Sequence, residues 1–238
     1  MAKTFVDTFT RTAAALGGST SSDGLFTWSI LDGPSVSTNG TSVDVASGHA
    51  AFAAGASADC DTDSMYAETD FTISNGSVAI WLDICGSGVY PSGTGYEFAC
   101  FGGSAYIFAI ASNTFTQLAT ASHSHTSGTY RAERNGSTLT FYRNGVSILT
   151  ASVASEPTGA GNRKAYFGGD TTGGSYNVAE FRYGDVGGSG TTDGVAASDG
   201  LGTALGVADS GGLSLGLVTT FKHRISSHPA PFQPGNPR

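Results

Sequence analysis

Short segments of alternating hydrophobic and polar residues, separated by turn residues, fill the first 186 positions of the chain. Residues 77–84 show the pattern most clearly, because every second side chain is a large apolar one. A period of two puts these side chains on one face of a β-strand and the others, including Trp81 and Asp83, on the opposite face. The same pattern predicts strands over residues 4–9, 25–30, 43–52, 77–84, 96–101, 105–111, 129–134, 137–143, 146–149, 163–167 and 176–183. No convincing amphipathic helix interrupts them, so the sequence predicts an all-β sandwich or barrel.

Two Asn-Gly pairs give the strongest local signals. Asn135-Gly136 separates the predicted strands 129–134 and 137–143, and Asn144-Gly145 leads into the strand that follows. Asn-Gly supplies the two positive φ angles of a two-residue type I′ hairpin turn. The sequence therefore predicts three consecutive antiparallel strands joined by two tight turns, with Asn135-Gly136 as the first turn.

The composition changes after Val186. Residues 187–216 are mostly Gly, Ser, Ala, Thr and Leu, and four Pro in residues 229–238 exclude regular structure there. We therefore expect a jelly-roll β-sandwich over residues 1–186 and a low-complexity, extended arm over residues 187–238. The arm cannot form a core of its own, so its apolar side chains are expected to contact other chains, with a trimer as one option. These side chains are Leu201, Leu205, Leu213, Leu215, Leu217 and Phe221.

The charge pattern limits the choice of partners. The 238-residue chain has a net charge of −8 at pH 7, which argues against a nucleic-acid partner. Ten acidic residues and no basic ones lie between Arg11 and Arg131. This asymmetry suggests an acidic face that meets cations, basic partners or a neighbouring copy, although a solvated surface explains it equally simply. No stretch approaches 18 apolar residues, so we expect no membrane span.

Cysteine usage and the first residues indicate where the chain is made. Cys60, Cys85 and Cys100 are odd in number and lie in apolar segments, so they are expected to be free, buried thiols. The first residues show no hydrophobic signal segment. We therefore expect synthesis in a reducing cytoplasm.

Several segments resemble known β-sandwich proteins. Residues 130–146, YRAERNGSTLTFYRNGV, resemble a strand pair of laminin-G-like members of the concanavalin A-like lectin/glucanase superfamily. Residues 6–11, VDTFTR, leading to Leu16-Gly17 and Trp28, resemble sandwich domains of bacteriophage virion proteins, especially minor tail proteins. Residues 176–181, YNVAEF, resemble the last strand of such sandwiches, which pairs beside the first. The resemblance covers residues 4–186 and implies an antiparallel jelly roll more firmly than a function.

The resemblance implies a structural protein of a virion, made in the host cytoplasm. The expected role is a minor tail or tail-fibre component that contacts other virion proteins, copies of itself and a host-surface glycan. Two alternatives remain open at this point: a decoration protein of the capsid surface and a carbohydrate-binding module.

The sequence contains only the beginning of a glucanase catalytic motif. Glucanases of the superfamily carry E-x-D-x-x-E or E-x-D-x-E on one strand, so that alternate carboxylates share a cleft. Only Glu68-Thr69-Asp70 begins this pattern, and Thr72 and Ile73 stand where the second Glu should be. The sequence therefore predicts a protein without glycosidase activity, and we expect it not to be an enzyme.

Aromatic and acidic side chains suggest a glycan-binding site. Trp81 and Asp83 lie on the less apolar face of their predicted strand, and Tyr90 and Tyr96 flank the Gly/Ser loop that follows. Together they could form a platform for a sugar. The alternative is that Trp81 fills a second layer of the sandwich or a subunit interface.

Three alternating aspartates suggest a cation site. On a strand, Asp59, Asp61 and Asp63 would share one face, and such like charges repel unless a cation or water screens them. Calcium at these residues is the one cofactor that the sequence suggests, although the EF-hand pattern fails and a solvated surface is the alternative.

Overall fold

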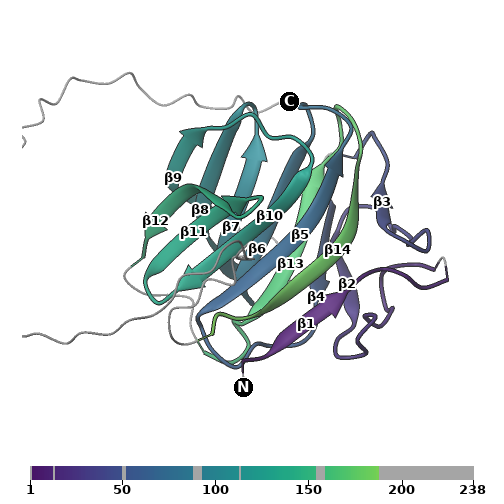
Figure 1. Ribbon diagram of the computed structural model, residues 1–238, viewed down its shortest axis with the longest axis horizontal. Helices are drawn as coiled ribbons and strands as arrows, with labels where there is room; N and C mark the ends of the chain where they lie inside the picture. Colours follow the sequence, from purple (N-terminus) through teal and green to yellow (C-terminus); the bar gives the residue numbers. More distant parts are fainter. Residues whose placement is uncertain are drawn as a thin grey trace, which may run out of the picture. The chain divides into compact units, whose positions relative to one another are not determined.

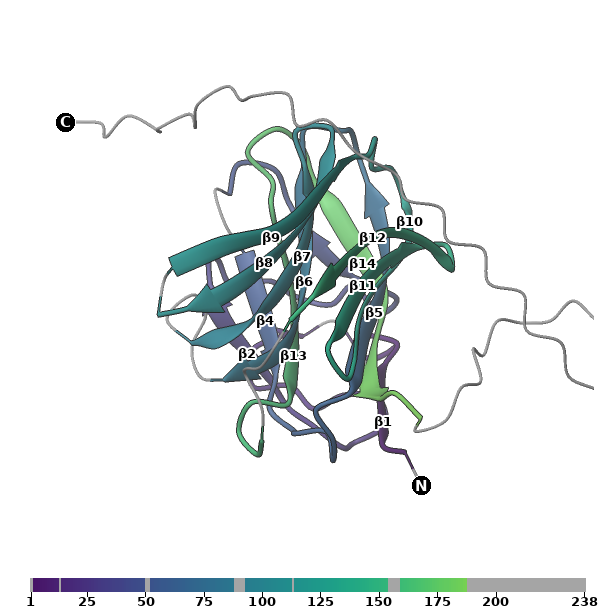
Figure 2. The same cartoon turned by 90° about the vertical axis from the view of Figure 1, so that its left-hand side faces the viewer.

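The computed structural model describes residues 2–12, 14–49, 52–87, 93–112, 114–153 and 159–187. These residues form fourteen β-strands in two antiparallel sheets that pack face to face (Figures 1 and 2). In the first sheet the strands follow the order β1 (Thr4–Asp7), β14 (Tyr176–Asp185), β5 (Met65–Ile73), β10 (Gly128–Asn135), β11 (Thr138–Arg143) and β12 (Val146–Ser152), and β3 (Val43–Val45) also pairs with β14. The second sheet has the order β2 (Trp28–Asp32), β4 (Phe52–Ala56), β13 (Lys164–Asp170), β6 (Ala79–Ser87), β7 (Thr94–Phe101), β8 (Ser104–Ala111) and β9 (Thr114–Ser122).

This arrangement confirms the predicted all-β jelly-roll sandwich. The last strand, β14, pairs with the first, β1, as expected from the resemblance. Strands β5 and β9 were not predicted, and the predicted strand 43–52 contains only β3 at one end and the first residue of β4 at the other. Within the described ranges no helix is long and apolar enough to cross a membrane.

The core lies between the sheets and is dominated by aromatic rings. Trp28, Phe167 and Phe181 meet at its centre, with ring centroids 5.2–5.6 Å apart. Aromatic pairs at such distances add about 0.5–1.5 kcal/mol each beyond the area that they bury. The free cysteines are buried as predicted, and burial raises the pKa of the Cys85 thiol to about 11.

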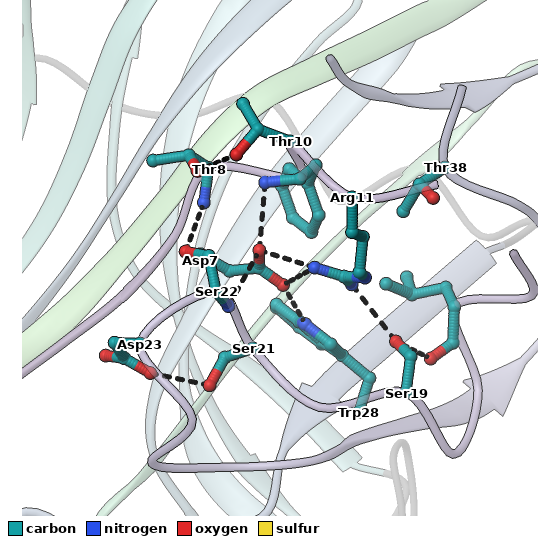
Figure 3. Close-up of polar contacts among 12 residues, drawn as sticks. Asp7, Thr8, Thr10, Arg11, Ser19, Ser21, Ser22, Asp23, Trp28 and Thr38 are labelled. Carbon is teal, nitrogen blue, oxygen red and sulfur yellow. Dashed lines mark hydrogen bonds and ion pairs between the residues drawn. The ribbon is translucent and has the colours of Figure 1, made fainter. Parts of the chain in front are cut away.

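A buried carboxylate ties the N-terminal strand to this core (Figure 3). Asp7 is fully buried and accepts hydrogen bonds from the Trp28 indole at 2.7 Å and from the Arg11 guanidinium at 2.6 Å. The backbone amides of Phe9 and Ser22 also donate to it. Because each carboxylate oxygen is satisfied, the charge is tolerated in the interior, and it joins the end of β1 to the loop before β2.

The meander of β10, β11 and β12 was predicted correctly, but its first turn is displaced by one residue. Asn135 pairs with Thr138, so Gly136 and Ser137 form the loop. Of these two only Gly136 has a positive φ, 59°, which is the pattern of a type II′ turn with Gly at its first central position. Asn144 and Gly145 both have positive φ and form the type I′ turn that was expected at Asn135-Gly136.

The predicted arm, residues 187–238, lies outside the described residues except for Gly187. The same holds for its six apolar side chains, from Leu201 to Phe221, and their expected contacts stay a prediction.

Candidate functional site

The outer face of the second sheet, directed away from the first sheet, carries two rows of side chains that run across its strands. Strand register places the members of each row opposite one another. The first row is Gly55, Tyr166, Asp83, Glu97, Phe108 and Gln117. The second row is Ala53, Gly168, Trp81, Ala99, Tyr106 and Thr120. The rows bring residues from six strands onto one surface, with Asp83 and Glu97 at its middle.

Glycines allow two large rings to lie against the sheet. A Cβ atom on Gly168 would overlap the Trp81 indole, and a Cβ atom on Gly55 or Gly86 would overlap the Tyr166 ring. The rings therefore occupy space that a side chain on the neighbouring strand would fill. Trp81 and Tyr166 are buried although they belong to the outer face rather than to the core between the sheets.

A β-bulge follows Asp83 along β6. The register of β6 against β7 shifts between Ile84 and Ser87, and Cys85 has a φ of 54°, which is rare for a residue with a side chain. The extra residue directs both Ile84 and Cys85 into the core and leaves Gly86 under Tyr166 on the outer face. Bulges of this kind occur often beside functional sites because they redirect side chains.

Two carboxylic acids face each other at the centre of this surface. Asp83 on β6 pairs with Glu97 on β7, and both are buried, with exposed fractions of 2% and 6%. Neither oxygen of Asp83 has a hydrogen-bond partner among the described residues. Burial raises the pKa of the Asp83 carboxyl well above its usual range, and the charge of Glu97 raises it further.

Tyr166 completes the buried polar group. Its hydroxyl also lacks a hydrogen-bond partner in the part of the chain that the structure describes. Burial raises the pKa of Tyr166, and the charge of Asp83 adds to this shift, so the two side chains lie within electrostatic reach of each other. Buried polar groups are normally hydrogen-bonded, and exceptions call for an explanation such as a bound ligand.

Beside this buried group, a more exposed row of aromatic rings extends across β7, β8 and β9. Phe101 stacks on Tyr106 with ring centroids 4.3 Å apart, and Tyr106 stacks on Phe108 at 5.5 Å. Phe115 contacts Phe108 edge to face. Phe101 and Phe115 are 38% and 39% exposed, so this aromatic row offers flat apolar surface to solvent.

The structure brings together only some of the residues that were predicted to form a glycan site. Trp81 and Asp83 share the outer face as expected, so Trp81 does not fill the layer between the sheets. Tyr96 was placed wrongly: it alternates with Glu97, lies in the core and contacts Arg134. Tyr90 lies outside the described residues. Sequence reasoning missed Glu97 and Tyr166, although alternation along their strands would have placed both on the outer face.

The three aspartates of the predicted calcium site do not lie on a strand. They fall in the loop between β4 and β5, where Asp61 pairs with Lys3 and Asp63 with Arg163. Asp59 accepts a hydrogen bond from the Gly161 amide. No three His, Cys, Asp or Glu side chains within the described ranges could hold a metal ion together. Basic side chains and a backbone amide thus contact these aspartates, which do not share one strand face.

Glu68, which begins the partial glucanase motif, lies on the outer face of the first sheet. Its carboxylate is 3.7 Å from both Arg131 and Arg182, which flank it on β10 and β14. With Asp70, Glu180 and Arg182 it lines a shallow hollow. We refer to Glu68, Asp70, Arg131, Glu180 and Arg182 as the charged row of the first sheet.

Comparison with known proteins establishes the fold. No protein-family model matches the chain, and no curated protein matches it in sequence. Among solved structures, a protein of unknown function with a galectin-like fold from Bacillus subtilis matches with a TM-score of 0.56 and 13% identity, covering 77% of this chain and 97% of that one. A β-glucanase from Bacillus licheniformis matches with a TM-score of 0.54 and 11% identity, covering 76% and 97%. A β-1,3-1,4-glucanase from a mouse hindgut metagenome matches with a TM-score of 0.53 and 8% identity, covering 76% and 98%.

These matches confirm the concanavalin A-like, galectin-like β-sandwich. They correct the expectation that the protein is not an enzyme, because two of the three similar structures are glucanases. That expectation required both acids on one strand, whereas Asp83 and Glu97 come together from two. The expected place in a bacteriophage virion finds no support in the comparisons and stays a prediction.

Proposed function

We propose that the outer face of the second sheet binds a glycan. The observation that supports this most is the buried carboxylate of Asp83, which has no hydrogen-bond partner among the described residues and lies beside the Trp81 and Tyr166 rings. A sugar offers hydroxyl groups to such acids and apolar C–H faces to such rings. Ligand sites commonly combine apolar and aromatic surface with a few placed polar groups in this way. The glucanases that share the fold act on polysaccharides and support this choice.

The aromatic row extends the proposed binding surface across several strands. Neighbouring strands lie about 4.8 Å apart, so the surface from Tyr166 on β13 to Phe115 on β9 crosses four strand spacings, roughly 19 Å. A sugar chain that lies across the strands could contact the exposed rings and the buried acids together. An extended polysaccharide therefore fits this face better than a single sugar.

Binding to soluble polysaccharides tests the proposal with a matched pair of variants. Tyr106→Ala removes a ring from the aromatic row, whereas Tyr142→Ala removes a ring of similar burial from the outer face of the first sheet. We expect the first variant to weaken binding about tenfold or more, equivalent to about 1.4 kcal/mol, and the second to leave it unchanged. Calorimetry against a panel of glucans and cell-wall polysaccharides measures this. The proposal is wrong if no glycan binds, or if both variants bind as well as the unaltered protein.

The acid pair favours a second candidate function, the cleavage of glycosidic bonds. Glycosidases use one carboxyl group that stays protonated as the acid and a second that is ionised. Asp83 has the raised pKa of the first, and Glu97 stands opposite it on the next strand. Release of reducing ends from a bound glycan would demonstrate the activity. It should vanish in Asp83→Asn and in Glu97→Gln, and persist in Glu68→Gln on the other sheet.

A further inference from the structure

We infer that the bound glycan carries a primary ammonium group, as a de-N-acetylated amino sugar does, and that this group docks against Asp83 and Glu97 between Trp81 and Tyr166. The inference rests on the proposed glycan-binding function and names the class of sugar that the site selects.

The arrangement of charge around Asp83 favours a positively charged ligand group. Two acids face each other across β6 and β7 in a nearly water-free position. Asp83 makes no ion pair with any described residue, and neither does Lys164, the basic residue that starts the strand carrying Tyr166. Like charges so placed repel each other, and burial penalises the charged form of Asp83. A ligand with a positive charge relieves the two penalties together, whereas a neutral sugar relieves only the missing hydrogen bonds.

The groups around the acids also suit an ammonium group. An ammonium group has three N–H donors and no acceptor, which suits the oxygens of Asp83 and the hydroxyl oxygen of Tyr166, since these have no partner within the described ranges. The faces of Trp and Tyr rings attract cations, most strongly where water is excluded. The acids and the rings thus both favour an ammonium group.

A divalent metal ion explains the same acids less well. Calcium takes six to eight oxygen ligands, and no group of three metal-binding side chains occurs within the described residues. An ammonium group needs only the two acids that are present. The adjoining aromatic row then holds the rest of the ligand through the apolar faces of its sugar rings, which a simple polyamine lacks.

The experiment compares two oligosaccharides of equal length that differ only at nitrogen: chitosan oligosaccharide, with free amines, and chitin oligosaccharide, with acetylated ones. Binding is measured by calorimetry at several pH values from mildly acidic to neutral, because the amine must carry its proton and the acid pair must be able to ionise. We expect the amine form to bind at least tenfold tighter to the unaltered protein. Asp83→Asn, which keeps the side-chain shape, should abolish this preference, and Glu97→Gln should reduce it.

Glu68→Gln is the matched control, because it removes the same charge from the outer face of the other sheet. It should leave the preference unchanged. Equal loss in Glu68→Gln and Asp83→Asn would show that the overall acidity of the chain attracts the amine, and the inference would be overturned. Competition by spermidine as strong as that of the oligosaccharide would overturn the glycan part, since the site would then recognise amines without sugar.

The outcomes separate this inference from the proposed function. Equal binding of both oligosaccharides, with loss in Tyr106→Ala, would sustain glycan binding and overturn the amine preference. Absence of binding by either oligosaccharide and by every polysaccharide of the panel would overturn both. Thermal unfolding of each variant shows whether a loss of binding reflects a loss of folding.

Discussion

The two sheets present outer faces that use acidic residues in opposite ways. On the first sheet, Glu68 lies between Arg131 and Arg182, partly open to water, and its charge is balanced on both sides. On the second sheet, Asp83 is buried beside another acid. Exposed ion pairs contribute about 0–1 kcal/mol each and need no further role to explain them. A buried acid that faces a second acid costs stability, and such groups are concentrated at functional sites.

The contrast between the two outer faces favours ligand binding on the second sheet. The charged row of the first sheet is satisfied by its own residues, and Arg131 also lies over the Tyr66 ring at 3.9 Å. On the second sheet, Asp83 and Tyr166 have polar atoms that find no hydrogen-bond partner in the part of the chain that the structure describes, and exposed rings lie beside them. A ligand can therefore add interactions on the second face, whereas on the first it would have to replace existing ones.

The largest effect is expected where the rings of the second face rest on glycine. A Cβ atom in Gly168→Ala would overlap the backbone carbonyl oxygen of Phe52 as well as the Trp81 indole, and a backbone atom cannot swing away. Such overpacking costs about 1–3 kcal/mol or more, and displacing the indole should also abolish glycan binding. Gly76→Ala is the control, because no atom lies within 4 Å of its added methyl group. Urea unfolding measures both. Equal stability of the two variants would show that the ring does not rest on the sheet.

A second, smaller effect should appear in the pH dependence of stability. Burial, with the charge of Glu97, raises the pKa of Asp83, so the folded protein holds this proton more tightly than the unfolded chain does. The stabilisation is complete below the unfolded pKa of about 3.9 and is lost as the pH rises through the folded pKa. The slope reaches about 1.4 kcal/mol per pH unit.

Asp83→Asn removes this slope, so its stability relative to the unaltered protein should increase from pH 4 to pH 8. The groups that face Asp83 from the neighbouring strands are Glu97 and Tyr166. Urea unfolding of both proteins at several pH values gives the comparison. A constant difference in unfolding free energy across the range would mean that Asp83 titrates normally in the folded state.

The sequence predicted the strands well where large apolar residues alternate with polar ones, as in β6. It failed for β5 and β9, since small or charged residues such as Ala67, Glu68 and Ala119 weaken the pattern there. Alternation placed Trp81 and Asp83 correctly because it depends on one strand only. The meeting of Asp83 with Glu97 and Tyr166 depends on register between three strands, of which β13 is distant in sequence, and the bulge at Cys85 shifts the register just beyond Asp83. Neither feature has a signature in a single sequence.

The smallest expected effect belongs to the charged row of the first sheet. Glu68→Gln removes the acid that lies between Arg131 and Arg182, and it should cost at most about 1 kcal/mol, because water and salt screen these partly exposed groups. At 1 M salt the Debye length is only about 3 Å, so the cost should nearly vanish there.

Glu97→Gln should respond differently to salt. Its environment is buried and salt reaches it poorly, so its change in unfolding free energy should be similar at low and high salt. Urea unfolding of both variants at two salt concentrations tests the contrast. If the two variants showed the same salt dependence, the acids of the two faces would share one electrostatic environment. The contrast that favours a ligand site on the second sheet would then be wrong.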